Sequence, residues 1–241
     1  MRPNLDDRDR IVLECIRDAD GPMGSWSLVE QLEAKGEKVS SASIGRILYR
    51  LEQLGYVEGQ GNKGRILTKT GLKAIARAKA YDSMDRHRKD LEKLINSKVL
   101  EDFVMVLQAR KAIERETARL AAENMTEAGK QSLIAILEEQ EAKAARGESI
   151  ADVDIAFHRE IAMASRNSAL LSLYGILAMM GQQSELFEVV RSRVDSPYRK
   201  AHRDILEALC RHDPDGAVAC IERHMDSLIE DVTKYWDRVK E

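Results

Sequence analysis

The sequence predicts a mainly α-helical protein, with a winged helix-turn-helix (three helices and a β-hairpin wing) at the N-terminus and an antiparallel all-α bundle behind it. Nine of the fourteen glycines lie in residues 1–71, where short periodic segments alternate with turns. Beyond residue 72, Ala, Leu, Glu, Lys and Arg repeat at helical spacing, and no segment alternates apolar and polar residues with period two. We therefore expect a domain at residues 1–71, a connecting helix at 72–99 and a second domain at 100–241.

Three helices and a hairpin are predicted within residues 1–71. Amphipathic helices are expected over residues 8–19, 25–36 and 39–55, with Ser25 or Ser27 capping the second and Gly36 following its end. Gly55 ends the third helix. Residues 56–58 and 65–68 are predicted as two short strands, joined by a glycine-rich turn that contains Asn62 and Lys63.

Residues 71–95 are predicted to form one long connecting helix, and the remainder to form a helical bundle. Helices are expected over residues 102–124, 126–145, 149–164 and 168–190. Two closing helices follow. The first is expected to begin at Pro197, and the second at Asp215 or Gly216, after Pro214.

Composition argues against a membrane-bound or disulfide-bonded protein. There is no run of about eighteen apolar residues, and the first ten residues contain aspartates where a secretory signal would be basic and then apolar. Cys15, Cys210 and Cys220 lie in apolar helical patterns at no zinc-ribbon spacing. We expect a cytoplasmic protein with no membrane partner, whose cysteines are reduced packing residues.

The charge is distributed unevenly along the first domain. Residues 1–37 carry five Lys and Arg against nine Asp and Glu, whereas residues 38–80 carry nine against two. A basic block of this kind indicates either a solvated basic face or a surface that contacts nucleic acid. The helix-plus-hairpin order favours DNA, with a protein or RNA partner as the alternative.

A helix fits the major groove of B-DNA and reads bases through its exposed face, while nearby Lys and Arg neutralise phosphates. The predicted helix over residues 39–55 carries polar residues on the side opposite its apolar stripe, and the hairpin is basic. The candidate DNA-binding residues are Ser41, Ser43, Arg46 and Arg50 on the helix, and Lys63 and Arg65 on the wing.

Residues 8–80, including the glycine-rich wing and the closing Thr68-x-x-Gly71, resemble the ribonuclease-R-type winged helix of nitrogen-regulation repressors in archaea and bacteria. The resemblance implies double-stranded operator DNA as the partner. Because one such domain makes too few contacts for operator-grade specificity, we expect a homodimer on a pseudo-palindromic site.

Four residues of the second domain form a candidate metal site. Asp154 and His158 are four residues apart on one predicted helix, so both project from the same face. His202 and His224 lie on the two closing helices at positions whose neighbours have core-type spacing. Three imidazoles and a carboxylate suit a first-row divalent ion and leave coordination positions open. Singly, each inward histidine is also explained as a hydrogen-bonded core residue.

About residues 100–238 resemble the sensor domain of the FadR branch of the GntR regulators. The segments that carry the resemblance begin with LQARKAIERETARLAAENMT, continue with DIAFH and ASRNSAL, and end with AHRDILEAL and A-x-x-x-I-E-R-H. The resemblance implies that Asp154, His158, His202 and His224 bind a divalent metal (Zn, Ni or Mn) and that the domain binds a small carboxylate effector. The stretch from residue 26 to 57 does not follow the usual GntR pattern, so operator sequence cannot be inferred from that family.

Arg110 and Asn167 also match the family pattern. The resemblance places Arg110 beside the effector, where a guanidinium would pair with a carboxylate. An ion pair with Glu114, one helical turn further on, explains Arg110 equally well. Asn167 is interpreted as a structural residue at a helix end.

The sequence thus predicts a metabolite-responsive, DNA-binding transcription regulator. One alternative is that the metal itself is the signal. Another is a metal-dependent enzyme with a targeting winged helix, which is disfavoured because no further His, Glu or Asp falls at a spacing that would place it beside the metal.

Overall fold

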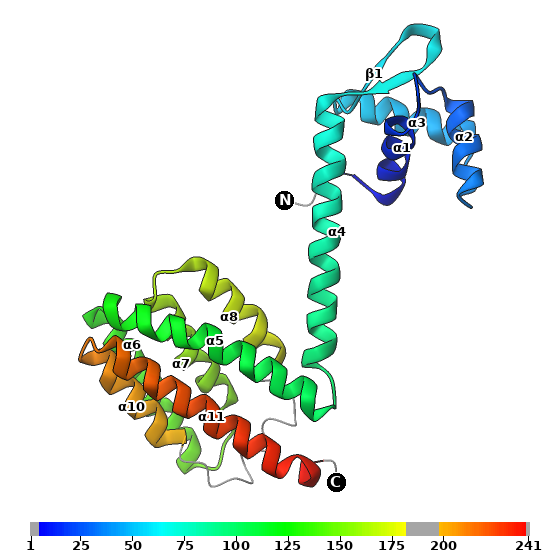
Figure 1. The fold of residues 1–241 in the computed structure, drawn as a ribbon. Helices are drawn as coiled ribbons and strands as arrows, with labels where there is room; N and C mark the ends of the chain where they lie inside the picture. Colours follow the sequence, from blue (N-terminus) through cyan, green and yellow to red (C-terminus); the bar gives the residue numbers. More distant parts are fainter. Residues whose placement is uncertain (1–4, 182–197, 240–241) are drawn as a thin grey trace. The chain divides into compact units, whose positions relative to one another are not determined.

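The computed structural model describes residues 5–181 and 198–239 (Figure 1). It divides into two compact units, Met1–Lys89 (unit 1) and Asp90–Glu241 (unit 2). The boundary falls inside helix α4, Lys69–Ile95. Ile75 of α4 belongs to the core of unit 1, and Ile95 packs with Val106 and Leu177 in unit 2.

Unit 1 is a winged helix-turn-helix, as predicted. Its elements are α1 (Asp7–Arg17), α2 (Ser25–Ala34), α3 (Ser41–Gln53), β1 (Val57–Gly59), a short 3₁₀ turn η1 (Gly61–Lys63), β2 (Arg65–Leu67) and the first part of α4. The strands pair antiparallel, with Glu58 opposite Ile66. Leucine, isoleucine and valine side chains from α1, α2 and α3 make the core, because each helix turns its apolar face inward.

Two local predictions in unit 1 were wrong. Helix α2 has neither Ser25 nor Ser27 as its N-cap: the cap is Gly24, without a side-chain hydrogen bond. The first strand begins at Val57 instead of residue 56, because the Tyr56 amide still donates to the Leu51 carbonyl at the end of α3. Gly55 permits this ending, since its φ is +70°.

Unit 2 is the predicted all-helical bundle. It contains α5 (Leu100–Asn124), α6 (Glu127–Ala145), α7 (Ala151–Ala164), α8 (Ser168–Gly181), α10 (Tyr198–Cys210) and α11 (Pro214–Val239). Helix α5 packs against α7, α8, α10 and α11, and α10 also packs against α6 (Figure 1). Polar residues that α5 directs into the bundle are therefore surrounded by most of the other helices.

The ends of two helices in unit 2 can be compared with the predicted ends. The last helix begins at Pro214, before the predicted Asp215 or Gly216, because Pro suits the first helical position and the Asp213 carboxylate accepts from the Gly216 amide at 2.9 Å. Asn167 caps α8, as its role at a helix end predicted, by accepting from the Ala169 and Leu170 amides. The predicted segment 182–190 and the start at Pro197 lie outside the described residues.

The three cysteines are unbridged, with Cys15 buried and Cys210 and Cys220 partly buried. Among the described residues, no helix combines the length and the apolar character needed to cross a lipid bilayer.

Candidate metal centre and nucleic-acid interface

The four predicted metal ligands are all buried in unit 2. Asp154 and His158 lie one turn apart on α7 and are 0% and 2% exposed, which confirms that they share an inward face. His202 on α10 and His224 on α11 are 0% and 6% exposed. Helix α7 and the two later helices α10 and α11 therefore bring these polar side chains into one apolar interior.

The histidines form a compact cluster. One ring nitrogen each of His158, His202 and His224 lies within 4.8 Å of the others, close enough to hold one metal ion. The His158 ring stacks on that of His224 with centroids 5.1 Å apart, and the His202 and His224 centroids are 4.7 Å apart. Asp154 Oδ1 lies 3.5 Å from His202 Nε2, so the carboxylate borders the cluster.

Two residues that the sequence did not single out as site residues contact the outer nitrogens of these imidazoles. Glu114 Oε2 on α5 lies 2.9 Å from His158 Nδ1, and Gln140 Oε1 on α6 accepts from His202 Nδ1 at 2.9 Å. Ligating histidines commonly have their second nitrogen held by such a carboxylate or carbonyl, which fixes the ring and its tautomer. Neither residue was predicted as a partner of the histidines, because spacing within a single helix does not show which residues of other helices lie beside them.

Arg110 and Glu114 form a buried ion pair on α5. The guanidinium Nε and one terminal nitrogen donate to Glu114 Oε1 at 2.8 and 2.7 Å, and both side chains are 2% exposed. Burial favours the neutral acid, but Arg110 and His158 outweigh it and lower the pKa of Glu114 to about 2. Of the two interpretations of Arg110, the structure therefore contains the ion pair.

The buried donor set fits a divalent cation. His158 Nε2 is fully buried and makes no hydrogen bond within the described residues. A buried imidazole nitrogen without a partner is costly unless something binds it. Because the Glu114 carboxylate lies 2.9 Å from Nδ1, Nε2 is the His158 nitrogen that remains to bind a cation.

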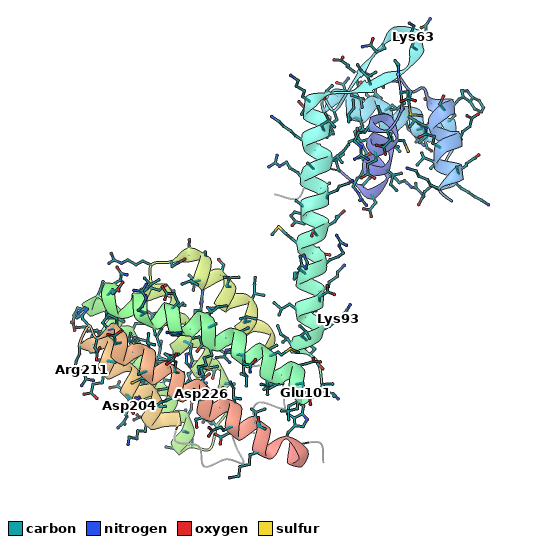
Figure 2. All side chains as sticks on the ribbon, viewed as in Figure 1. Lys63, Lys93, Glu101, Asp204, Arg211 and Asp226 are labelled. Atoms are coloured by element: carbon teal, nitrogen blue, oxygen red, sulfur yellow. The ribbon has the colours of Figure 1, made fainter. Side chains whose placement is uncertain are left out.

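On the nucleic-acid side, the six predicted contact residues have different surroundings in unit 1. Helix α3 begins after Ser40, whose hydroxyl caps it, so Ser41 and Ser43 lie in its first turn. The Arg46 side chain is exposed and donates to Ser43 Oγ at 3.3 Å. Lys63 lies at the tip of the hairpin (Figure 2) and is exposed.

Arg50 and Arg65 are engaged within unit 1. The Arg50 guanidinium donates to the carboxylates of Asp9 and Asp6 at the start of α1. Arg65 on β2 pairs with Glu52 of α3, with its Nε 3.0 Å from Glu52 Oε2. Both guanidinium groups are therefore already bound to carboxylates of unit 1.

The fold, together with its matches among known proteins, places this chain in the class of transcription regulators. The FCD domain model matches residues 105–227, and the Ribonuclease R winged-helix domain model matches residues 10–75. The chain belongs to the FCD-domain family and is a FadR-like regulator of the GntR type.

Curated relatives carry names of the same class. The Exu regulon transcriptional regulator of Escherichia coli K12 is 29% identical over 82% of this chain and 72% of its own length. The HTH-type transcriptional regulator LutR of Bacillus subtilis is 25% identical over 86% of this chain and 91% of its own length. A GntR family member from Pseudomonas syringae superposes with a TM-score of 0.50 at 15% identity, covering 96% of this chain and 84% of that one. These relatives are transcription regulators and not enzymes.

Proposed function

We propose that this protein is a homodimeric, metabolite-responsive regulator whose helical unit binds a divalent metal through Asp154, His158, His202 and His224, together with a small organic acid. The observation that carries the proposal is the cluster of three buried imidazoles, two of which have one ring nitrogen 2.9 Å from an oxygen of Glu114 or Gln140. Such contacts are typical of metal ligands, and a group of buried imidazoles that includes an unpartnered nitrogen on His158 is costly in a core that binds nothing.

Each residue has a distinct part in this site. His158, His202 and His224 offer neutral nitrogen donors from three helices, and Asp154 offers an anionic oxygen beside His202. A bound first-row cation would supply positive charge and open coordination positions that a carboxylate oxygen can fill. The ion pair with Glu114 holds the Arg110 guanidinium in the interior of unit 2. The family resemblance implies that this guanidinium faces the effector.

DNA recognition is assigned to unit 1. Arg46 and Lys63 are exposed on α3 and at the tip of the wing, where a base edge and the phosphate backbone respectively would meet them. Ser41 and Ser43 supply hydroxyl groups in the first turn of α3. Two copies of the unit on a pseudo-palindromic operator double this small contact area.

The metal site is tested by elemental analysis of the purified chain and of His202→Ala and His224→Ala. The expected result is about one equivalent of a divalent metal in the wild type and a loss of most of it in each variant. His87→Ala removes a histidine from the exposed part of α4 and is the matched control, which should retain the wild-type metal content. Stoichiometric metal in His224→Ala would show that the site is wrongly assigned.

The response is tested by measuring operator affinity with and without added organic acids. An effector can shift affinity only through different binding to two conformations of the protein. We expect a shift in the wild type that His202→Ala and His224→Ala lose and His87→Ala keeps. A full shift on titrating metal alone, with no acid present, would favour the alternative in which the metal is the signal.

A further inference from the structure

Helix α3 has one exposed stripe, formed by Ala42, Arg46, Tyr49 and Gln53. These residues lie within about 60° of one another around the helix axis, because each residue advances by about 100°. All four are exposed, and the Tyr49 side chain, at 63%, is one of the most exposed large apolar side chains of unit 1. Within the described residues, no hydrogen bond or ion pair engages the Tyr49 side chain.

The two edges of this stripe are fixed by ion pairs. On one edge Arg50 binds Asp9 and Asp6 of α1, and on the other Glu52 binds Arg65 of the wing. The Arg65 backbone is fixed as well, since its amide and carbonyl both pair with Met23 at 2.9 Å. The helix is thus held to α1 on one side and to the hairpin on the other, with the stripe open between them.

Arg50 is poorly placed to leave Asp9 for a base. The Asp9 side chain is 2% exposed, and removing the cation that pairs with a buried carboxylate is strongly destabilising. Burial raises the pKa of the Asp9 carboxyl, and the hydrogen bond from Arg50 opposes that rise. Moving Arg50 away from Asp9 to contact DNA would therefore lower the stability of unit 1.

We propose that Tyr49 reads sequence beside Arg46, through contact of its ring with a thymine methyl group, and that Arg50 and Arg65 are positioning residues that hold α3 in place. An aromatic ring on an exposed helix face suits the C5-methyl of thymine, while an arginine suits the two acceptors of guanine. This inference rests on DNA binding by unit 1.

The test begins with a selection from random DNA duplexes by the full-length wild-type chain, with and without EDTA. The enriched duplex and a scrambled duplex then serve as probes for Tyr49→Ala, Tyr49→Phe and Arg50→Gln. We expect Tyr49→Ala to weaken binding to the enriched duplex about tenfold or more and to leave the scrambled duplex nearly unchanged. Tyr49→Phe keeps the ring and should bind like the wild type.

Uracil in place of each thymine of the enriched duplex locates the contact. Loss of the methyl group should weaken wild-type binding by about threefold to fivefold at one position of each half-site. At that same position Tyr49→Ala should be insensitive to the replacement. Equal sensitivity of both proteins at every position, or wild-type affinity of Tyr49→Ala, would overturn the assignment of Tyr49.

A double variant at Asp9 and Arg50 tests whether Arg50 holds α3 in place or reads a base. Arg50→Gln should lower the melting temperature of unit 1 and weaken both duplexes alike, and the double variant Asp9→Asn/Arg50→Gln should recover both stability and sequence preference. A double variant that folds stably but has lost preference at one base pair would show that Arg50 reads DNA. A wild-type selection that enriches no sequence would contradict DNA reading by unit 1 as a whole.

Discussion

Replacing Arg110 by Met should destabilise unit 2, and by more at pH 7 than at pH 5. The substitution leaves the Glu114 carboxylate 2% exposed without its guanidinium. The least costly response of the variant is to protonate the Glu114 carboxylate, which costs about 1.36 kcal/mol for each pH unit above the ordinary pKa of 4.5. The destabilisation should therefore be smaller at pH 5 than at pH 7, by up to about 3 kcal/mol.

The pH dependence has opposite signs in the two proteins. In the wild type the pKa of Glu114 is lowered to about 2, so its ionisation stabilises the fold above pH 4.5 and this contribution is lost as the pH falls toward 2. In Arg110→Met the folded pKa lies above the unfolded value, since burial then acts with much less opposition. The variant should therefore regain stability relative to the wild type as the pH falls from 7 to 5.

Urea unfolding with EDTA present measures this difference. Trp236 is 4% exposed in the core of unit 2, and a Trp26→Phe background leaves it as the sole tryptophan reporter. Arg119→Met is the matched control, because Arg119 forms a more exposed pair with Glu123 on the same helix. A loss below about 1 kcal/mol at pH 7, or a loss equal at both pH values, would refute the view that Arg110 neutralises a buried carboxylate.

Three further outcomes are expected. Asn167→Ala removes the side-chain acceptor for two amides at the start of α8 and should cost about 1 kcal/mol, read as a fall of about 2–4 °C in the unit 2 melting temperature; an unchanged value would show that water caps the helix equally well. Gly64→Ala should destabilise unit 1 by on the order of 2 kcal/mol, because φ is +116° and a Cβ would overlap the Met23 carbonyl, and urea unfolding followed through Trp26 in a Trp236→Phe background should detect this. EDTA should lower the melting temperature of unit 2 but leave that of unit 1 unchanged; the same treatment of His202→Ala should have no effect, and an equal fall there would argue against the site.

Much of the candidate metal site could be predicted because its signal is local. Asp154 and His158 are four residues apart on α7, and the apolar neighbours of His202 and His224 indicate which way each points. Glu114 and Gln140 gave no such signal as site residues. Their relation to His158 and His202 depends on how α5 and α6 pack against α7 and α10, which periodicity within a helix does not specify.

On helix α3, too, the sequence did not show which exposed residues contact other helices. Helical periodicity places both Tyr49 and Arg50 outside the apolar stripe, and chemical type alone favoured the arginine. The deciding contact is with Asp9, which lies 41 residues earlier in the chain. Acidic residues in residues 1–37 thus pair with basic residues in residues 38–80, and the ion pair between Lys79 and Glu14 is a further example. Part of the uneven charge is therefore neutralised within unit 1.

The buried polar cluster of unit 2 draws on residues from 110 to 224, and this wide separation has a consequence for biosynthesis. A chain that is still being translated contains Arg110, Glu114, Asp154 and His158 well before α11 exists. Until His224 and the apolar face of α11 emerge, these polar groups have no closed interior and stay hydrated. Contacts of such long range form late and slow folding. Helix α11, which is synthesised after the other described helices, is therefore the one that completes both the core and the site.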